Sequence, residues 1–296
     1  MWPLPRPRQS ARDTYLTCIG KARPDKQKIL NQYVADVDSA ARRFDLAARA
    51  AELHALNAAE FGPSRQCDAG HEECDGDRAE QGCVHAKELT KVYTDRMAGK
   101  RSPGRAVYDA LCSAAPYGRC PLCGQRQVGT LDHHLPKSSY PFLAVAPTNL
   151  VPCCFDCNHT KKDSAPASES EQTLHPYFDN IDDHRWLRAR LIEKDPASLN
   201  FYVAPAGTWP AKLTERVQSH FSLLNLNGLY SAQAAGELTE ISPHISQLIP
   251  HGSGCVREYL LEVADSRAAT RRNGWTTATY YALAESDWFC SGRAIS

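Results

Sequence analysis

Apolar residues recur at three- and four-residue steps in the first third of the chain, and this spacing predicts amphipathic helices. The longest such stretch predicts one helix over residues 25–58, with charged residues on its other face. Asn57 and the following Gly62-Pro63 are signals that end a helix. We therefore expect one long helix to dominate the N-terminal region.

The helical pattern is then interrupted and returns twice. Residues 62–83 hold almost no large apolar side chain, which predicts an acidic, glycine-containing loop or insertion. Apolar positions predict a helix over residues 84–98 and another over 104–114. Ser102 followed by Pro103 favours the start of the second one, because this pair is typical of a helix N-terminus.

A short segment in the middle of the chain has the pattern of two strands and a helix. Residues 128–131 predict a strand, residues 150–151 its partner, and residues 155–162 the start of a helix. This order predicts a hairpin covered by a helix.

The C-terminal half changes character twice. Residues 174–204 predict short strands around Tyr177-Phe178, 186–192 and 199–203. After residue 208 the pattern is helical, with breaks expected near 225–228, Pro243 and 251–254. The fold class expected for the whole chain is α+β and mainly helical.

Composition places the chain among ordinary soluble globular proteins. It has 296 residues, of which 42% are hydrophobic and 23% charged, enough for one large or two modest domains. It has no apolar run of about 18 residues, so no transmembrane helix is expected. The first residues contain arginine and proline without an apolar stretch, unlike a secretory signal. We expect an intracellular protein.

Charge is balanced overall but uneven along the chain. A net charge of zero argues against a protein that coats nucleic acid non-specifically. However, residues 1–28 carry seven Lys or Arg against two Asp, and residues 119–162 carry five against two. Residues 66–82 carry six Asp or Glu and one Arg. The middle segment is thus mildly basic beside an acidic one.

Twelve cysteines are many for this length, and four of them form two CxxC pairs about thirty residues apart. In a reducing compartment such pairs favour a single tetrahedral zinc held by four thiolates over disulfides. Cys153 adjoins the second pair, but its spacing to the last cysteine is CxxxC, so Cys154 is preferred. The alternative is that the cysteines bind no metal. The expected structural zinc ligands are Cys120, Cys123, Cys154 and Cys157.

A second group of ligand-type residues lies in and after the acidic segment: Cys67, His71, Cys74, Cys83 and His85. The spacings are irregular, so the sequence leaves open whether these residues bind another metal or belong to a solvated insertion.

Between the two cysteine pairs stand residues suited to hydrolysis of a phosphodiester. Asp132 offers a carboxylate and Asn158 an amide oxygen, which are ligands for Mg²⁺ or Mn²⁺. His133 can take a proton from water near neutral pH and is the candidate general base. It ends the predicted strand, where a turning backbone could let both side chains line one cleft. Asn149 is expected to fix the histidine ring or hold the loop.

Several neighbouring residues are weaker candidates. Lys137, Lys161 and Lys162 could contact a nucleic-acid backbone as point charges, or form a solvated face. His134 and His159 could touch the metal or a phosphate, or simply adjoin the motif.

With these residues in view, the segment resembles HNH endonucleases of the subgroup that carries zinc knuckles. The resemblance implies that Asp132 and Asn158 hold the catalytic metal, that His133 is the general base and that Asn149 supports the site. It covers about 45 residues and implies a small zinc-stabilised ββα-metal core in the mainly helical chain.

A wider resemblance rests on TLDHHLPKSSYP, VAPTNLVPCC, LHPYFD, RVQSH at 216–220 and DTYLTCIG. These segments are similar to the HNH nuclease subunit of Septu-type anti-phage defence systems. The resemblance implies a cytoplasmic prokaryotic DNA endonuclease that works with an ATPase partner, although the acidic segment departs from that group. The residues leave open RNA or single-stranded DNA as substrate, and a non-catalytic zinc-stabilised module that binds nucleic acid.

The sequence thus predicts three regions. Residues 1–115 form a helical region with the acidic insertion at about 62–83, and residues 116–165 form the nuclease core with its zinc knuckles. Residues 166–296 form a C-terminal region of short strands followed by helices.

Overall fold

The structure is a computed structural model that describes residues 1–63, 76–163 and 165–294, with side chains of the fourth helix described from residue 85 onward. The chain forms two compact units, residues 1–179 and 180–296. The boundaries expected at 115/116 and 165/166 are finer divisions that these two units do not test. The fold is α+β and mainly helical, as predicted, with two small two-stranded sheets.

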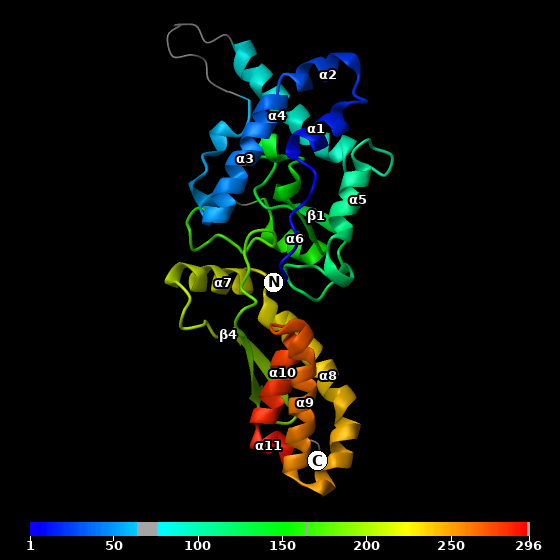
Figure 1. The fold of residues 1–296 in the computed structure, drawn as a ribbon, viewed down its shortest axis with the longest axis vertical. Coiled ribbons are helices and arrows are strands. Elements are labelled where there is room, and N and C mark those ends of the chain that lie inside the picture. The colour runs from blue at the N-terminus through cyan, green and yellow to red at the C-terminus, as the bar shows by residue number, and fades with distance from the viewer. Residues whose placement is uncertain (64–75, 164, 295–296) are drawn as a thin grey trace. The chain divides into compact units, whose positions relative to one another are not determined.

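The first unit surrounds a short hairpin with helices (Figure 1). Helices α5 and α6 pack on the strands, while α1, α3 and α4 build the rest of the core. The largest fully buried side chains of that core include Tyr15, Phe44 and Phe61. The elements are α1 (Ala11–Ile19), α2 (Pro24–Asn31), α3 (Val34–Ala50), α4 (Gly76–Arg96), α5 (Arg105–Ser113), β1 (Thr130–His133), β2 (Leu150–Cys153) and α6 (Phe155–Lys161), with short 3-10 turns at Leu53–Ala55, Ala58–Glu60, Pro116–Gly118, Pro141–Leu143 and Pro147–Asn149.

The single helix predicted over residues 25–58 is wrong, because the chain breaks at residues 32–33 and the second helix ends at Ala50. Tyr33 turns its ring onto Phe142, with centroids 5.6 Å apart, and its hydroxyl lies 2.7 Å from the His85 ring nitrogen. Ala51 adopts a left-handed conformation, with φ of 59°, that closes the helix end. The helical spacing of apolar residues continues through Tyr33, but the tertiary contacts of Tyr33 interrupt the helix there.

The hairpin agrees with the predicted order but is shifted along the chain. β1 begins two residues later than expected and includes Asp132 and His133 as its last two residues. It pairs antiparallel with β2, with Asp132 opposite Val151 and His133 opposite Leu150. Two four-residue strands are too few to be stable alone, so the hairpin depends on the helices packed around it.

The second unit places a strand pair against long helices. α10 packs on β3 and α8 on β4, and Figure 1 shows α8, α9 and α10 running side by side. Trp186 and Phe201 are buried in it. The elements are β3 (Leu187–Ile192), β4 (Ser198–Val203), α7 (Ala211–Leu223), α8 (Leu226–Leu248), a 3-10 turn at Ile249–His251, α9 (Ser253–Arg271), α10 (Trp275–Glu285) and α11 (Asp287–Cys290).

Most of the boundaries predicted for the C-terminal half are confirmed, and two predictions are wrong. The strands at 187–192 and 198–203 and the breaks near 225 and 252 are present. The break at Pro243 is absent, because α8 continues through it with Ile241 and Ile245 buried on either side. Tyr177-Phe178 lies in a turn of the first unit rather than in a strand.

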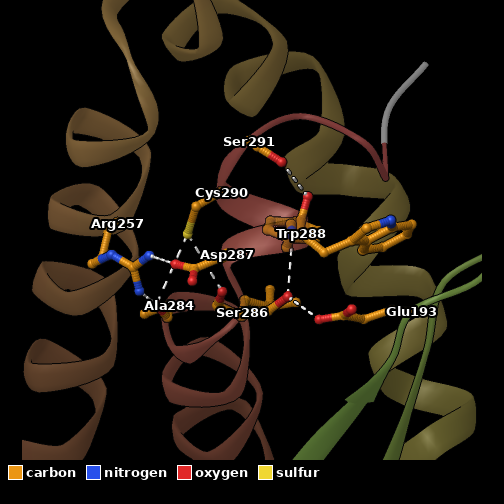
Figure 2. Close-up of polar contacts among 10 residues, drawn as sticks. Glu193, Arg257, Ala284, Ser286, Asp287, Trp288, Cys290 and Ser291 are labelled. Carbon is orange, nitrogen blue, oxygen red and sulfur yellow. Dashed lines mark hydrogen bonds and ion pairs between the residues drawn. The ribbon is translucent and has the colours of Figure 1, made fainter.

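A cluster of polar contacts fastens the C-terminal helix to the rest of its unit (Figure 2). The Ser286 hydroxyl caps α11 by accepting from the Phe289 amide, and it donates to Glu193 just after β3 at 2.7 Å. Arg257 of α9 forms an ion pair with Asp287. These contacts join the first and last elements of the unit.

Among the described residues, no helix is long and apolar enough to cross a membrane.

Replacing Gly104 by alanine should destabilise the first unit. A Cβ at this position would lie 2.5 Å from the Cys18 sulfur and 2.9 Å from the Arg96 carbonyl oxygen, so packing must shift. We expect a loss of about 1–3 kcal/mol in the free energy of unfolding, measured by urea denaturation. Gly99→Ala is the matched control, since its nearest neighbour would be 3.6 Å away. Equal effects of the two substitutions would contradict the packing described.

Candidate active site and metal centre

Four buried cysteines from the two CxxC pairs come together beside the hairpin. The Sγ atoms of Cys120, Cys123, Cys154 and Cys157 all lie within 4.8 Å of one another. Four sulfurs around a zinc ion at about 2.3 Å would be separated by a similar distance. The geometry and the thiol donors fit a tetrahedral zinc, as predicted.

Local backbone geometry shapes each cysteine pair into a turn that points both sulfurs inward. The Arg126 amide donates to the Cys123 sulfur at 3.5 Å, and the Cys157 amide donates to the Cys154 sulfur at 3.4 Å. The Arg126 side chain also forms an ion pair with Asp156 at 2.8 Å, linking the two turns. Amide donors stabilise thiolate ligands, because they partly offset the negative charge that four sulfurs bring to one ion.

Position separates the group of four cysteines from the neighbouring Cys153. The hydrogen bond with the Cys120 thiol lowers the pKa of Cys154. Burial instead raises the pKa of Cys153, and its sulfur lies outside the group. The structure thus selects Cys154 over Cys153, as the CxxC spacing indicated.

Asp132 lies buried between β1 and α6, and its carboxylate is paired with a lysine. The Lys161 ammonium is 2.9 Å from Asp132 Oδ2. The Asp132 side chain is 5% exposed and the Lys161 side chain 7%. Burial raises the pKa of Asp132, and the nearby Lys161 charge opposes that shift. The Lys161 ammonium therefore compensates the charge of a carboxylate that lies inside the unit.

Lys161 also fastens the end of β1 to α6. Its ammonium donates to the carbonyl oxygens of His133 and His134, at 2.8 and 2.9 Å. From its position after the second cysteine pair, Lys161 was expected to contact the nucleic-acid backbone. A side chain 7% exposed and held by three oxygens offers little surface to a phosphate, so the structure argues for a positioning role.

His133 faces a different surface of the strand. Its ring packs edge-on against Tyr93 of α4, with centroids 4.4 Å apart, and its Nε2 lies 2.8 Å from the Ala144 carbonyl oxygen. A carbonyl oxygen only accepts hydrogen bonds, so Nε2 carries the proton and Nδ1 keeps a lone pair. Burial lowers the pKa of His133 to about 3, which keeps the ring neutral at pH 7.

Asp132 and His133 thus leave β1 towards different elements, as neighbours on a strand do. The single cleft expected at the turning end of the strand is replaced by two faces, one against α6 and one against Tyr93.

Asn149 holds the loop that follows β1 rather than the histidine ring. Its side chain accepts from the Leu135 amide at 2.8 Å and donates to the carbonyl oxygens of Leu135 and Leu143. It is fully buried. Of the two roles expected for Asn149, the structure shows the second.

Asn158 lies half-buried on α6, three residues before Lys161. Residues three apart share a face of a helix, so Asn158 lies on the face that meets Asp132. His159 and Lys162 are exposed, and Lys137 is half-buried with its ammonium 5.8 Å from the Tyr93 ring centroid. Lys137 therefore lies on the His133 side of the strand.

Two buried histidines stack behind the hairpin. The rings of His134 and His175 have centroids 4.2 Å apart, and Phe44 and Phe178 pack around His175. In the sequence, His175 stands inside the LHPYFD segment with no spacing that indicates a role. Tyr93 was also missed, because its apolar position in a helical pattern indicated core packing alone.

Most of the second group of ligand-type residues lies outside the described residues or has no described side chain, namely Cys67, His71, Cys74 and Cys83. His85 is described, and its ring nitrogen is hydrogen-bonded to the Tyr33 hydroxyl.

Comparison with known proteins gives one informative relationship. Protein ea31 of Escherichia phage lambda is 34% identical over 157 residues, which cover 52% of this chain and 53% of that protein. This chain is a distant homologue of it over that part, and it spans about half the length of the curated relative it matches. No family profile matches the chain, and no solved structure matches it.

Purified protein is expected to release about one zinc per chain when its thiols are modified, as measured with a colorimetric chelator. Cys157→Ser should remove most of this zinc and lower the thermal midpoint strongly, because binding of a structural zinc contributes about 10–16 kcal/mol in small domains. Cys255→Ser, at an exposed position of the second unit, is the control and should keep the zinc. Full zinc content in Cys157→Ser would contradict a four-cysteine site.

Removing the buried ammonium should be costly because it leaves the Asp132 carboxylate uncompensated. We expect Lys161→Met to lower the free energy of unfolding by about 3–5 kcal/mol. Adding Asp132→Asn should recover part of that loss, since it removes the unpaired charge. Lys162→Met, at the exposed neighbouring position, should change stability by less than about 0.5 kcal/mol. Denaturant unfolding of the parent, Lys161→Met, Asp132→Asn, the double variant and Lys162→Met tests this. Additive effects of the two single substitutions would exclude an interaction between Lys161 and Asp132.

Proposed function

We propose that the chain is a metal-dependent endonuclease of the HNH type that hydrolyses phosphodiester bonds of DNA. The observation that carries this proposal is the placing of Asp132 and His133 at the end of β1, in a hairpin joined to α6 by the four-cysteine group. A strand pair, a helix and this residue order are what the resemblance to HNH endonucleases implies.

Asp132 and Asn158 would hold the catalytic Mg²⁺ or Mn²⁺, since a carboxylate and an amide oxygen are hard donors that suit these ions. When bound, such an ion neutralises charge on the phosphate and assists the leaving oxygen. The Lys161 ammonium, 2.9 Å from the Asp132 carboxylate, opposes the rise in the pKa of Asp132 that burial causes. The donor set therefore fits a divalent ion in chemistry.

His133 would act as the general base at the strand end. With Nε2 donating to the Ala144 carbonyl, Nδ1 is the atom free to take a proton from the attacking water. Tyr93 fixes the ring from one side, and Asn149 holds the loop that carries the Ala144 carbonyl. Lys137, beside Tyr93, would meet a phosphate on the same face.

The wider function we propose is that of an effector in a prokaryotic anti-phage defence system, working with an ATPase partner. Its support is the resemblance of LHPYFD and RVQSH to the nuclease subunit of Septu-type systems. In this proposal the helical surfaces around the hairpin serve for docking.

Cleavage of supercoiled plasmid in Mg²⁺ or Mn²⁺ tests the proposal. His133→Ala should reduce the rate by about 10²- to 10⁴-fold, as loss of a general base does. Asp132→Asn should reduce it at least as much while keeping the shape of the buried side chain. His251→Ala, an exposed histidine of the second unit, is the matched control and should cleave normally.

Zinc content and the thermal midpoint of each variant show whether it is folded. Undiminished plasmid cleavage by folded His133→Ala would refute the assignment of the base. Cleavage of a matched RNA strand but not of DNA would show that RNA, and not DNA, is the substrate. Binding of nucleic acid without turnover would favour a non-catalytic module.

A further inference from the structure

The basic N-terminal segment is an ordered part of the first unit. The Trp2 amide donates to the Pro121 carbonyl oxygen at 2.7 Å, and the Leu4 amide donates to that of Pro176 at 2.8 Å. The Leu4 side chain is buried. Prolines alternate with the other residues over positions 3–7, and each fixes its backbone φ. The arginines that follow are therefore presented from a restrained backbone.

Arginines from this segment and from α3 line one open depression of about 330 Å³. Pro147 and Thr148 also line it. The charged residues around it are Arg6, Arg8, Arg42, Arg49, Asp38 and Asp45. Four guanidinium groups against two carboxylates give this depression, here called the arginine groove, a positive balance of two charges.

The contacts of these arginines identify which charges face solvent. Arg42 forms an ion pair with Asp38 at 2.6 Å, and Arg6 donates to the Tyr177 carbonyl and packs over Phe178. Arg8 and Arg49 are exposed, and no ion pair within the described part of the chain involves either of them. Two guanidinium groups thus remain for an external anion.

The arginine groove adjoins the candidate active site through the backbone. Pro147 and Thr148 directly precede Asn149, which holds the loop beside His133. On the other side, Arg6 contacts the Tyr177 carbonyl, and the Tyr177 hydroxyl donates to Leu150 at 3.0 Å. Leu150 is the strand partner of His133. Groove and hairpin are therefore parts of one packed unit.

We propose that the arginine groove binds the phosphate backbone of DNA and holds the nucleic acid beside the site of cleavage, an inference that rests on the proposed nuclease function. Guanidinium groups match phosphate oxygens in geometry and stay charged at all relevant pH values. The groove is open and draws its arginines from two segments, so it suits an extended chain of phosphates. Backbone contacts of this kind fix the position of DNA without reading its sequence.

The test is the salt dependence of DNA binding by Arg8→Gln/Arg49→Gln. A 20-base-pair duplex is titrated by fluorescence anisotropy without Mg²⁺ or Mn²⁺, so that no cleavage occurs. Each lost phosphate contact reduces the slope of log K against log salt by about 1, so the double variant should lose about 2. Affinity at 0.1 M salt should fall by roughly tenfold or more, to a similar degree for duplexes of different sequence.

Arg190→Gln/Lys194→Gln is the matched control, because it removes two exposed positive charges from the second unit. It should leave slope and affinity nearly unchanged. An unchanged slope in Arg8→Gln/Arg49→Gln, an equal loss in the control, or no binding of DNA by the parent protein would each overturn the proposal.

Plasmid cleavage separates this inference from the proposed function. At saturating DNA, Arg8→Gln/Arg49→Gln should cleave at the parent rate, and only the DNA concentration for half-maximal rate should rise. If the parent protein does not cleave but the binding slope changes as expected, the result contradicts the proposed nuclease function. It would still support DNA binding by the arginine groove. Loss of the maximal rate in the double variant would place these arginines in the reacting site. That result would overturn a role limited to binding the DNA backbone.

Discussion

The candidate site depends on one buried ammonium group. Lys161 joins the helix α6 to the carboxylate of Asp132 and to the carbonyl oxygens of two consecutive residues at the end of β1. A carboxylate 5% exposed would be strongly unfavourable without a cation, and the ammonium would be equally unfavourable without its oxygens. Each group therefore stabilises the other in the buried setting, and together they fix α6 at the end of β1.

The four-cysteine group and the helical core secure the same hairpin from different sides. Four-residue strands cannot bury enough surface alone, so one end of the hairpin relies on the sulfurs. The apolar side chains of Leu131, Leu135 and Leu150 anchor the other end in the core built by α1, α3 and α4. Asp132 and His133 lie between these two supports, where the backbone has little freedom to shift.

The parts of the site fixed by short-range spacing could be predicted from the sequence. Two CxxC pairs gave the sulfur ligands, and the choice of Cys154 over Cys153 followed from spacing alone. The burial of Lys161 could not be foreseen, because a lysine near a basic motif is usually solvated, and only the packing of α6 on β1 brings it to Asp132. The break at Tyr33 and the continuous helix through Pro243 have the same origin, since tertiary contacts overrode local signals.

The contacts of the N-terminal segment have a consequence for how the protein is made. Arg6 reaches Tyr177 across 171 positions of the chain, and Leu4 pairs with Pro176. Contacts between residues so distant in sequence form late in folding, because closing a long loop costs chain entropy. On the ribosome, Leu4 and Arg6 emerge well before Pro176 and Tyr177, so they must wait for nearly the whole unit before they can dock. The arginine groove is therefore completed only after the hairpin has been synthesised. A chain truncated before Pro176 would carry Asp132 and His133 without this surface.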